Sequence, residues 1–389
     1  MTDGLLFRIP LGEWTRDAVD WLTTNLNSFF NFIADDLLQP MYSFLNNFLL
    51  TPNLLSLAVV FTVVALLWKG WKAGAYTAGT FLLAYVLDTW VTGTGGLGWD
   101  WWLPAIILAL VAAGVYAWKG KSIGIPVAIG AAVAFAMDMW LLVSHGAEEG
   151  LQGDVDALPW WTIVVFLTVV AFAASGWKLA LLAIISFAII YGVNQWENAM
   201  SSFALVLVAS IITIVIGVPI GILAAKNKWV SAIVRPILDF LQTMPAFVYL
   251  IPFVVLFGIG VVPGIVATIL FSIAPAVRFT ELGIRGVDRE VVEAAHAFGS
   301  HPLRILGQIE LPLARPTIMG GINQVIMLAL SMIVIAGMVG AGGLGRDVYT
   351  SVTSVNISLG AESGLAVVLL AIYLDRVTAS FGVSHKDKL

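Results

Sequence analysis

Long apolar stretches separated by short polar turns dominate this chain of 389 residues. Several of the stretches contain proline or glycine, which helices in a bilayer tolerate when neighbouring groups satisfy the freed backbone. Eleven stretches approach the roughly 20 residues that a helix needs to cross a membrane: 53–69, 73–91, 103–118, 122–142, 160–175, 178–195, 201–224, 240–258, 260–279, 316–339 and 357–376. The pattern predicts an all-α, polytopic membrane protein with about 11 transmembrane helices.

The first 52 residues follow a different pattern. From Trp14 to Phe48 apolar residues recur at roughly helical spacing, with polar residues between them. The segment opens without a cationic region and carries acids throughout, so it is not a secretory signal peptide. We expect residues 1–52 to form one or two amphipathic helices, which either lie on a membrane surface or pack against the protein's own bundle.

The composition excludes several classes of function. Apolar residues make up 60% of the chain and charged residues only 11%, against about 25% in soluble proteins. The net charge of −5 without a basic run argues against nucleic-acid binding. The absence of cysteine excludes disulfides and thiolate metal sites, and the four histidines lack zinc-protease spacing. The spans hold no catalytic triad or convergent carboxylate pair, so we expect neither a metal site nor a catalytic site.

The basic residues give the spans an orientation. If the loop 280–315 is cytoplasmic, all but three of the 19 basic residues lie on the cytoplasmic side; the exceptions are Arg8, Arg16 and Arg346. Cytoplasmic loops of membrane proteins are enriched in lysine and arginine. The charges therefore predict an N-terminus outside and a C-terminus inside. Asp239 and Glu281 lie near the cytoplasmic boundary, where we expect solvated surface charges.

Residues 53–196 show an internal repeat. Trp68–Gly70 and Trp118–Gly120 have the same sequence 50 residues apart, and a weaker copy begins at Gly176–Lys178. The repeat predicts three transmembrane helical hairpins over 53–196, each with a short basic turn. The alternative is a chance likeness between apolar hairpins.

Two glycine patterns are weak signals. Gly340–Gly345 matches the dinucleotide-binding pattern, but that pattern works only between a strand and a helix, and here it follows a long apolar helix. We reject that function. Gly217 and Gly221 have the spacing that lets membrane helices approach closely, although chance also produces such spacings in a chain with 37 glycines.

The longest cytoplasmic loop predicts two short helices joined by a turn. Asp288 is a plausible N-cap for the first helix, Gly299 ends it, and His301 and Pro302 start the second, which Pro312 ends. Small residues and one acid on the first helix would let another surface approach. The loop is therefore either a docking site for a cytosolic partner or a self-packed hairpin.

The spacing within this loop resembles a known signature. Glu293-Ala294-Ala295, three residues, Gly299, nine residues, then Ile309, Leu311 and Pro312 is similar to the signature of permease subunits of binding-protein-dependent ABC importers. Phe240–Pro252 and Leu374–Arg376 resemble the glycine betaine/proline betaine (quaternary ammonium) branch. The resemblance implies a type I ABC importer permease core over 197–380, with a coupling loop at 284–314 and a cytoplasmic tail at 381–389. Residues 1–52 would then be periplasmic or interfacial.

The resemblance also implies partners and residue roles. Glu293, Ala294, Ala295 and Gly299 would contact a cytosolic pair of ABC ATPase subunits, which bind the ATP and magnesium, while this chain itself has no cofactor. Ile309, Leu311 and Pro312 would anchor the loop to the bundle. A periplasmic substrate-binding protein and a second copy of the chain would complete the complex in the lipid of a bacterial inner membrane. Typical members have one front hairpin, whereas this chain has three.

The implied activity is import by alternating access. The solutes would be small methylated ammonium compounds, namely glycine betaine, choline, proline betaine or trimethylamine N-oxide, with an osmoprotective or nutritional purpose. Cationic methylammonium groups bind to aromatic faces, so Phe240, Met244, Phe247 and Tyr249 are pathway candidates, with packing as their alternative role. A permease for another solute such as an amino acid remains the main rival, ahead of an ion-coupled secondary transporter.

Overall fold

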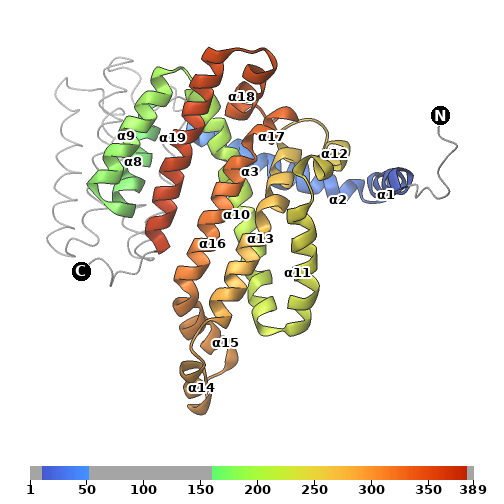
Figure 1. The fold of residues 1–389 in the computed structure, drawn as a ribbon, viewed down its shortest axis with the longest axis vertical. Coiled ribbons are helices and arrows are strands. Elements are labelled where there is room, and N and C mark those ends of the chain that lie inside the picture. Colours follow the sequence, from blue (N-terminus) through green and yellow to red (C-terminus); the bar gives the residue numbers. More distant parts are fainter. Residues whose placement is uncertain (1–10, 52–159, 383–389) are drawn as a thin grey trace, which may run out of the picture. The chain divides into compact units, whose positions relative to one another are not determined.

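The computed structural model describes residues 11–51 and 160–382, and every regular element in these ranges is a helix (Figure 1). The predicted spans 53–69, 73–91, 103–118 and 122–142, with two of the three hairpin repeats, lie outside the described residues. The chain divides into two compact units, Met1–Asn46 with Thr168–Leu389 and, separately, Asn47–Leu167.

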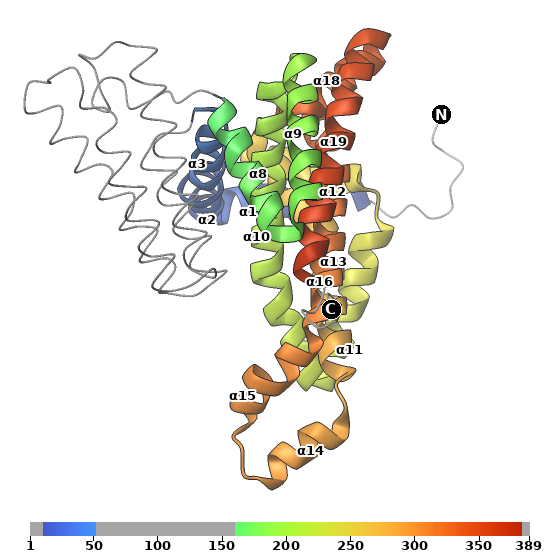
Figure 2. The ribbon, with the colours of Figure 1, turned by 90° about the vertical axis from the view of Figure 1, so that its left-hand side faces the viewer.

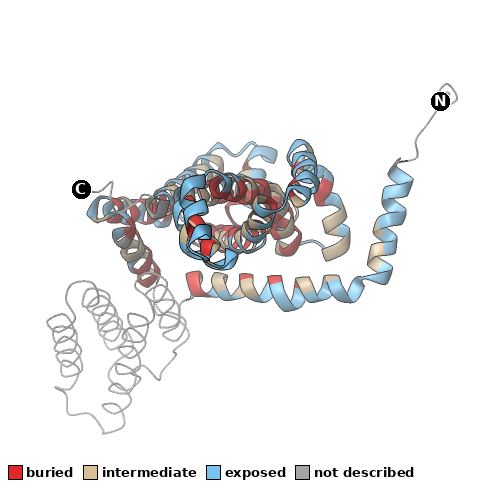
Figure 3. Ribbon diagram, turned by 90° about the horizontal axis from the view of Figure 1, so that it is seen from below, coloured by how far each residue is buried: buried red, intermediate tan, exposed pale blue. Residues whose placement is uncertain are grey.

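The N-terminal segment is helical, as its pattern predicts. It comprises α1 (Leu11–Asn25), α2 (Asn27–Asn31), the π-helix η1 (Phe32–Leu38) and α3 (Gln39–Leu50). Most of its surface is exposed (Figure 3), and Trp14 and Trp21 are each 59% exposed. Phe30 nevertheless packs edge-on against Phe257 of the bundle, with ring centroids 5.6 Å apart. The segment thus combines a bundle contact with exposed aromatic side chains.

Four long apolar helices form the centre of the larger unit. They are α10 (Trp196–Lys226), α13 (Val261–Arg285), α16 (Leu311–Ser331) and α19 (Ile357–Gly382). Within the described ranges, four helical segments are long and apolar enough to cross a membrane, and they coincide with the predicted spans 201–224, 260–279, 316–339 and 357–376. Helix α13 lies between α10 and α16, and α16 packs on α19. These predictions are confirmed.

Two shorter apolar helices precede this core. Helices α8 (Trp161–Ser175) and α9 (Trp177–Gly192) coincide with the predicted spans 160–175 and 178–195. Gly176 joins them with a φ of +81°, the conformation that favours glycine. Helix α9 packs against α19, where Phe187 lies edge-on to Tyr373 with ring centroids 5.0 Å apart. The third hairpin repeat is therefore a helical hairpin.

The predicted span 240–258 is not one continuous helix. Helix α11 (Lys228–Thr243) and helix α12 (Ala246–Phe257) meet there at an angle of 96°. Met244, between them, has an extended backbone with φ −77° and ψ 128°. Proline disfavours the helical conformation in the residue before it, so Pro245 breaks the helix at Met244.

The end of the span 316–339 is also more complex than predicted. A break at Met332 separates α16 from α17 (Ile333–Met338), and α18 (Gly343–Thr353) follows as a helix that the hydropathy pattern did not predict. Gly340, Gly342 and Gly343 all have positive φ values and form the turn between α17 and α18. The glycine pattern is thus a helix–helix turn, and no strand precedes it in the described ranges. Its backbone is held by Leu344, whose N–H donates to Ser202 Oγ on α10 at 2.8 Å.

Two glycines allow a close crossing of α10 and α13. A Cβ added at Gly217 would lie 2.5 Å from Ala276 Cβ, and one added at Gly221 would lie 2.7 Å from the carbonyl oxygen of Val277. Both partners belong to α13. The pair Gly217 and Gly221 therefore allows α10 and α13 to approach at a distance that no side chain would permit.

We expect Gly221→Ala to destabilise the protein by about 1–3 kcal/mol, because a backbone oxygen cannot move away from the new methyl group. Thermal unfolding in detergent would measure the change. Gly320→Ala is the matched control, since its added Cβ meets nothing within 4 Å in the helix α16. The control should be neutral or stabilising by up to about 1 kcal/mol. Equal losses in both variants would contradict the role of the crossing.

Candidate coupling loop and solute pathway

The loop 284–314 projects beyond the core helices (Figure 2). It contains α14 (Arg289–Ala297), α15 (Pro302–Ile305) and the π-helix η2 (Leu306–Glu310). Asp288 caps α14, because its Oδ1 accepts from the N–H of Glu290 at 2.9 Å. Gly299 follows with a φ of +73°, and His301 caps α15 by accepting from the N–H of Leu303. The two predicted helices and their turn are confirmed.

Pro312 does not end the second helix, contrary to the prediction. The backbone stays helical from η2 through Leu311 into α16, and Pro312 lies in the first turn of α16. The loop therefore continues without a hinge into a core helix.

The outer surface of the loop is apolar as well as charged. Glu293, Ala294 and Gly299 are exposed, whereas Ala295 is buried. Phe298 is 89% exposed and Leu303 72% exposed. Large apolar side chains at the tip of a projection are characteristic of surfaces that a partner covers. The sequence pattern did not single out Leu303, and its one signal was its position directly after the helix-starting Pro302.

The inner end of the loop is held by an ion pair that the sequence pattern did not reveal. Glu310 of η2 is 4% exposed, and its carboxylate lies 2.5 Å from the Lys226 ammonium at the end of α10. Ile309 and Leu311 beside it are half-buried, whereas Pro312 is exposed. The predicted anchor residues therefore surround a charged contact between the loop and α10.

Glu281 is not a solvated surface charge, contrary to the prediction. It is 3% exposed, and its Oε1 accepts from Ser231 Oγ at 2.8 Å and from Arg235 Nη2 at 2.9 Å, both on α11. Arg285, one turn further along α13, lies 2.9 Å from the same oxygen and donates to the carbonyl oxygen of Ala224 on α10. A buried charge requires such partners. One carboxylate thus joins three helices near the base of the loop.

Asp239 behaves as predicted. Its side chain is 65% exposed and forms an ion pair with Arg278. Exposed pairs of this kind contribute little, since water solvates both charges in either state.

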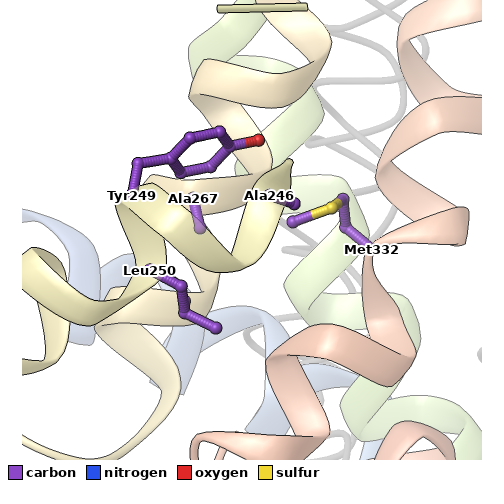
Figure 4. Packing of buried hydrophobic residues seen from close by; sticks show 5 residues of the cluster. All are labelled: Ala246, Tyr249, Leu250, Ala267 and Met332. Carbon is purple, nitrogen blue, oxygen red and sulfur yellow. The ribbon is translucent and has the colours of Figure 1, made fainter. Parts of the chain in front are cut away.

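The four pathway candidates do not come together. Phe240 and Phe247 are exposed, at 62% and 49%. Tyr249 is 5% exposed and belongs to an apolar cluster with Ala246, Leu250, Ala267 and Met332 (Figure 4), against which the half-buried Met244 packs. The structure therefore brings only Met244 and Tyr249 into one site.

Comparison with known proteins identifies the family. Residues 217–381 match the family described as "Binding-protein-dependent transport system inner membrane component". The glycine betaine/carnitine transport permease protein GbuB of Listeria monocytogenes is 45% identical over 247 residues, which cover 62% of this chain and 88% of GbuB. The chain belongs to the glycine betaine branch of the ABC transport permeases. The resemblance seen in its sequence is confirmed.

Two further relatives of this permease are also named as glycine betaine permeases. The glycine betaine permease protein OpuAB of Bacillus subtilis is 46% identical over 63% of this chain and 88% of OpuAB. The glycine betaine/proline betaine permease protein ProW of Escherichia coli is 43% identical over 62% of this chain and 68% of ProW. Among solved structures, a chain of the inward-facing methionine ABC transporter MetNI is similar. The aligned region covers 48% of this permease and 95% of the MetNI chain, with 23% identity and a TM-score of 0.43.

We expect Glu281→Gln to lower the free energy of unfolding by about 1.5–3 kcal/mol, because charge-assisted hydrogen bonds of a buried carboxylate are lost. Thermal unfolding of the purified permease would measure this. Asp239→Asn is the control: it removes one exposed charge at the same end of the bundle and should cost less than about 1 kcal/mol. A neutral Glu281→Gln would refute the structural role of the carboxylate.

Proposed function

We propose that this permease imports small methylated ammonium solutes, with ATP hydrolysed by a separate subunit. The solute class is glycine betaine and proline betaine, extended to choline and trimethylamine N-oxide by their shared methylated ammonium chemistry. The proposal rests on the high identity to permeases named for glycine betaine. It is supported by the projecting loop, whose exposed Phe298 and Leu303 need a partner to cover them.

The partners follow from the same proposal. A pair of ABC ATPase subunits binds the loop 284–314 in the cytoplasm, and Glu293, Ala294, Ala295 and Gly299 lie at that contact. A periplasmic binding protein delivers the solute, and a second copy of the permease completes the pathway in the bacterial inner membrane. The N-terminus then lies outside and the C-terminus inside. The exposed Arg289, Arg304 and Arg315 of the loop end support a cytoplasmic location.

The charged contacts of this region explain how a displacement of the loop would be transmitted to the core helices. When the ATPase pair closes, α14 and α15 move with it. Because η2 runs directly into α16, and Glu310 is paired with Lys226, the displacement passes to α16 and α10 together. Glu281 and Arg285 connect α10, α11 and α13 at the same level. The core helices then move as one body between outward- and inward-open states.

Reconstitution of the permease with its ATPase and binding protein tests the proposal. We expect ATP-dependent uptake of glycine betaine into proteoliposomes, with competition by proline betaine, choline or trimethylamine N-oxide. Uptake of an amino acid alone would refute the solute class. Uphill uptake by the purified permease on an ion gradient, without the ATPase, would refute the ATP-driven mechanism.

The coupling contact gives a further prediction. Proline cannot adopt the φ of +73° found at Gly299, because its ring fixes φ near −65°. Gly299→Pro should leave membrane insertion intact, since the loop lies outside the spans, and lower solute-stimulated ATP hydrolysis in the assembled complex by about tenfold or more. Glu293→Arg should have the same effect by reversing a charge at the contact.

Gly307→Ala is the control for the coupling variants. Gly307 belongs to η2 in the same loop, and an added Cβ would meet nothing within 4 Å. ATP hydrolysis by the Gly307→Ala complex should match the unaltered complex. Normal coupling in both Gly299→Pro and Glu293→Arg would exclude the docking role of this surface.

A further inference from the structure

Helix α12 begins at an N-terminus that no side chain of the described ranges caps. Pro245 holds the N-cap position, and no side chain accepts a hydrogen bond from the first turn. The first N–H groups of a helix have no intrahelical acceptor, so the amides of Ala246 and Phe247 point out of the helix end. The aligned peptide dipoles give this end a partial positive charge, which favours an anionic group.

The hydroxyl group of Tyr249 lies near the same N-terminus of α12. The Tyr249 side chain is 5% exposed, and its buried hydroxyl oxygen has no hydrogen-bond partner among the described residues. Figure 4 shows the ring lying across the start of α12, with the hydroxyl directed to the side on which Ala246 and Met332 lie. A buried hydroxyl without a partner is costly to maintain. The hydroxyl therefore indicates a ligand that supplies an acceptor.

The rest of the surroundings suits a methylated cation. The Phe253 ring lies with its centroid 6.4 Å from that of Tyr249, and the two planes are tilted by 58°. Met244, Phe271 and Met332 belong to the same apolar cluster. Aromatic faces attract quaternary ammonium groups through the ring quadrupole, and methionine side chains adapt to irregular shapes.

We propose that Tyr249 and the N-terminus of α12 form a solute-binding subsite within the permease itself. The Tyr249 hydroxyl and the free amides of Ala246 and Phe247 hold the carboxylate of a betaine, while its methylated ammonium lies against the Tyr249 and Phe253 rings. In glycine betaine one methylene separates the two charges, so a single tyrosine can contact both ends of the molecule. This inference rests on the proposed function and locates its solute contact.

The break before α12 provides a means of access. Tyr249 is closed to solvent in this conformation, so the solute reaches it only if α12 moves away from Met332. The backbone hydrogen bonds nearest the break, from Met244 to Phe240 and from Val248 to Pro245, each stay on one side of it. Helix α12 can therefore turn about Met244 and Pro245 without breaking bonds in α11. In many transporters, discontinuous helices form the substrate site, and the N-terminus of a half-helix faces the anionic group of the substrate.

Tyr249→Phe tests the subsite in the reconstituted complex. The variant removes one hydroxyl that has no partner in the described part of the chain, so the thermal unfolding midpoint should be unchanged or higher. We expect glycine betaine uptake per ATP hydrolysed to fall about tenfold, as for a lost hydrogen bond to a charged group. Tyr349→Phe is the matched control, because Tyr349 lies 39% exposed on α18 and should tolerate the change.

The outcomes separate the subsite from the proposed function. Unaltered uptake per ATP in Tyr249→Phe would overturn the subsite even if the unaltered complex imports glycine betaine. A lower unfolding midpoint in Tyr249→Phe would also overturn it, since the hydroxyl would then hold a lipid headgroup or water in the resting protein. Failure of the unaltered complex to import any methylated ammonium solute would instead refute the proposed function.

Discussion

The close crossing of α10 and α13 is the contact on which the rest of this permease depends. Lipid chains are as apolar as the side chains of a membrane helix, so helices associate there through close packing and polar contacts. Gly217 and Gly221 supply the close packing, because Ala276 Cβ and the Val277 carbonyl oxygen of α13 occupy the space that side chains would need. Thr213 Oγ1 and Ser272 Oγ lie 3.2 Å apart one turn further along, within hydrogen-bond distance. Close packing and a polar contact therefore both stabilise the same pair of helices, α10 and α13.

The polar contacts of the core are concentrated where the loop 284–314 begins and ends. Arg285 satisfies a carbonyl oxygen near the end of α10, and Lys226 at that end pairs with Glu310. Each contact joins residues far apart in the sequence. The helix ends are thereby fixed to one another, while α12 has no such restraint at its N-terminus. Charged contacts thus hold the helix ends near the loop, whereas apolar packing surrounds Tyr249.

The sequence predicted those features that depend on local signals. The caps at Asp288 and His301 and the turn at Gly299 act within a few residues, so the order of residue types along the chain is enough to recognise them. The apolar spans were equally clear. The break at Met244 could not be predicted from Pro245, because other prolines of the chain do not break their helices. Inside continuous helices lie Pro219, Pro236, Pro252 and Pro275. Hydropathy alone does not show which proline a bundle will accommodate.

The candidate site was predicted less completely than the fold. Glu281 is buried because Ser231, Arg235 and Arg285 converge on it from two helices, and sequence separation conceals that meeting. Helix α12 is apolar on every side, so its pattern could not separate the buried Tyr249 from the exposed Phe247. In both cases the deciding information is the packing of helices distant in sequence.

The aromatic side chains of α12 form a row that extends to the N-terminal segment. Tyr249, Phe253 and Phe257 succeed one another along α12, with neighbouring ring centroids 6.4 and 6.2 Å apart. Phe257 in turn meets Phe30 of α2. Edge contacts between rings have a preferred geometry that aliphatic contacts lack. A rotation of α12 would therefore either move α2 as well or break the contact between Phe257 and Phe30. In both cases the amphipathic segment opposes the rotation.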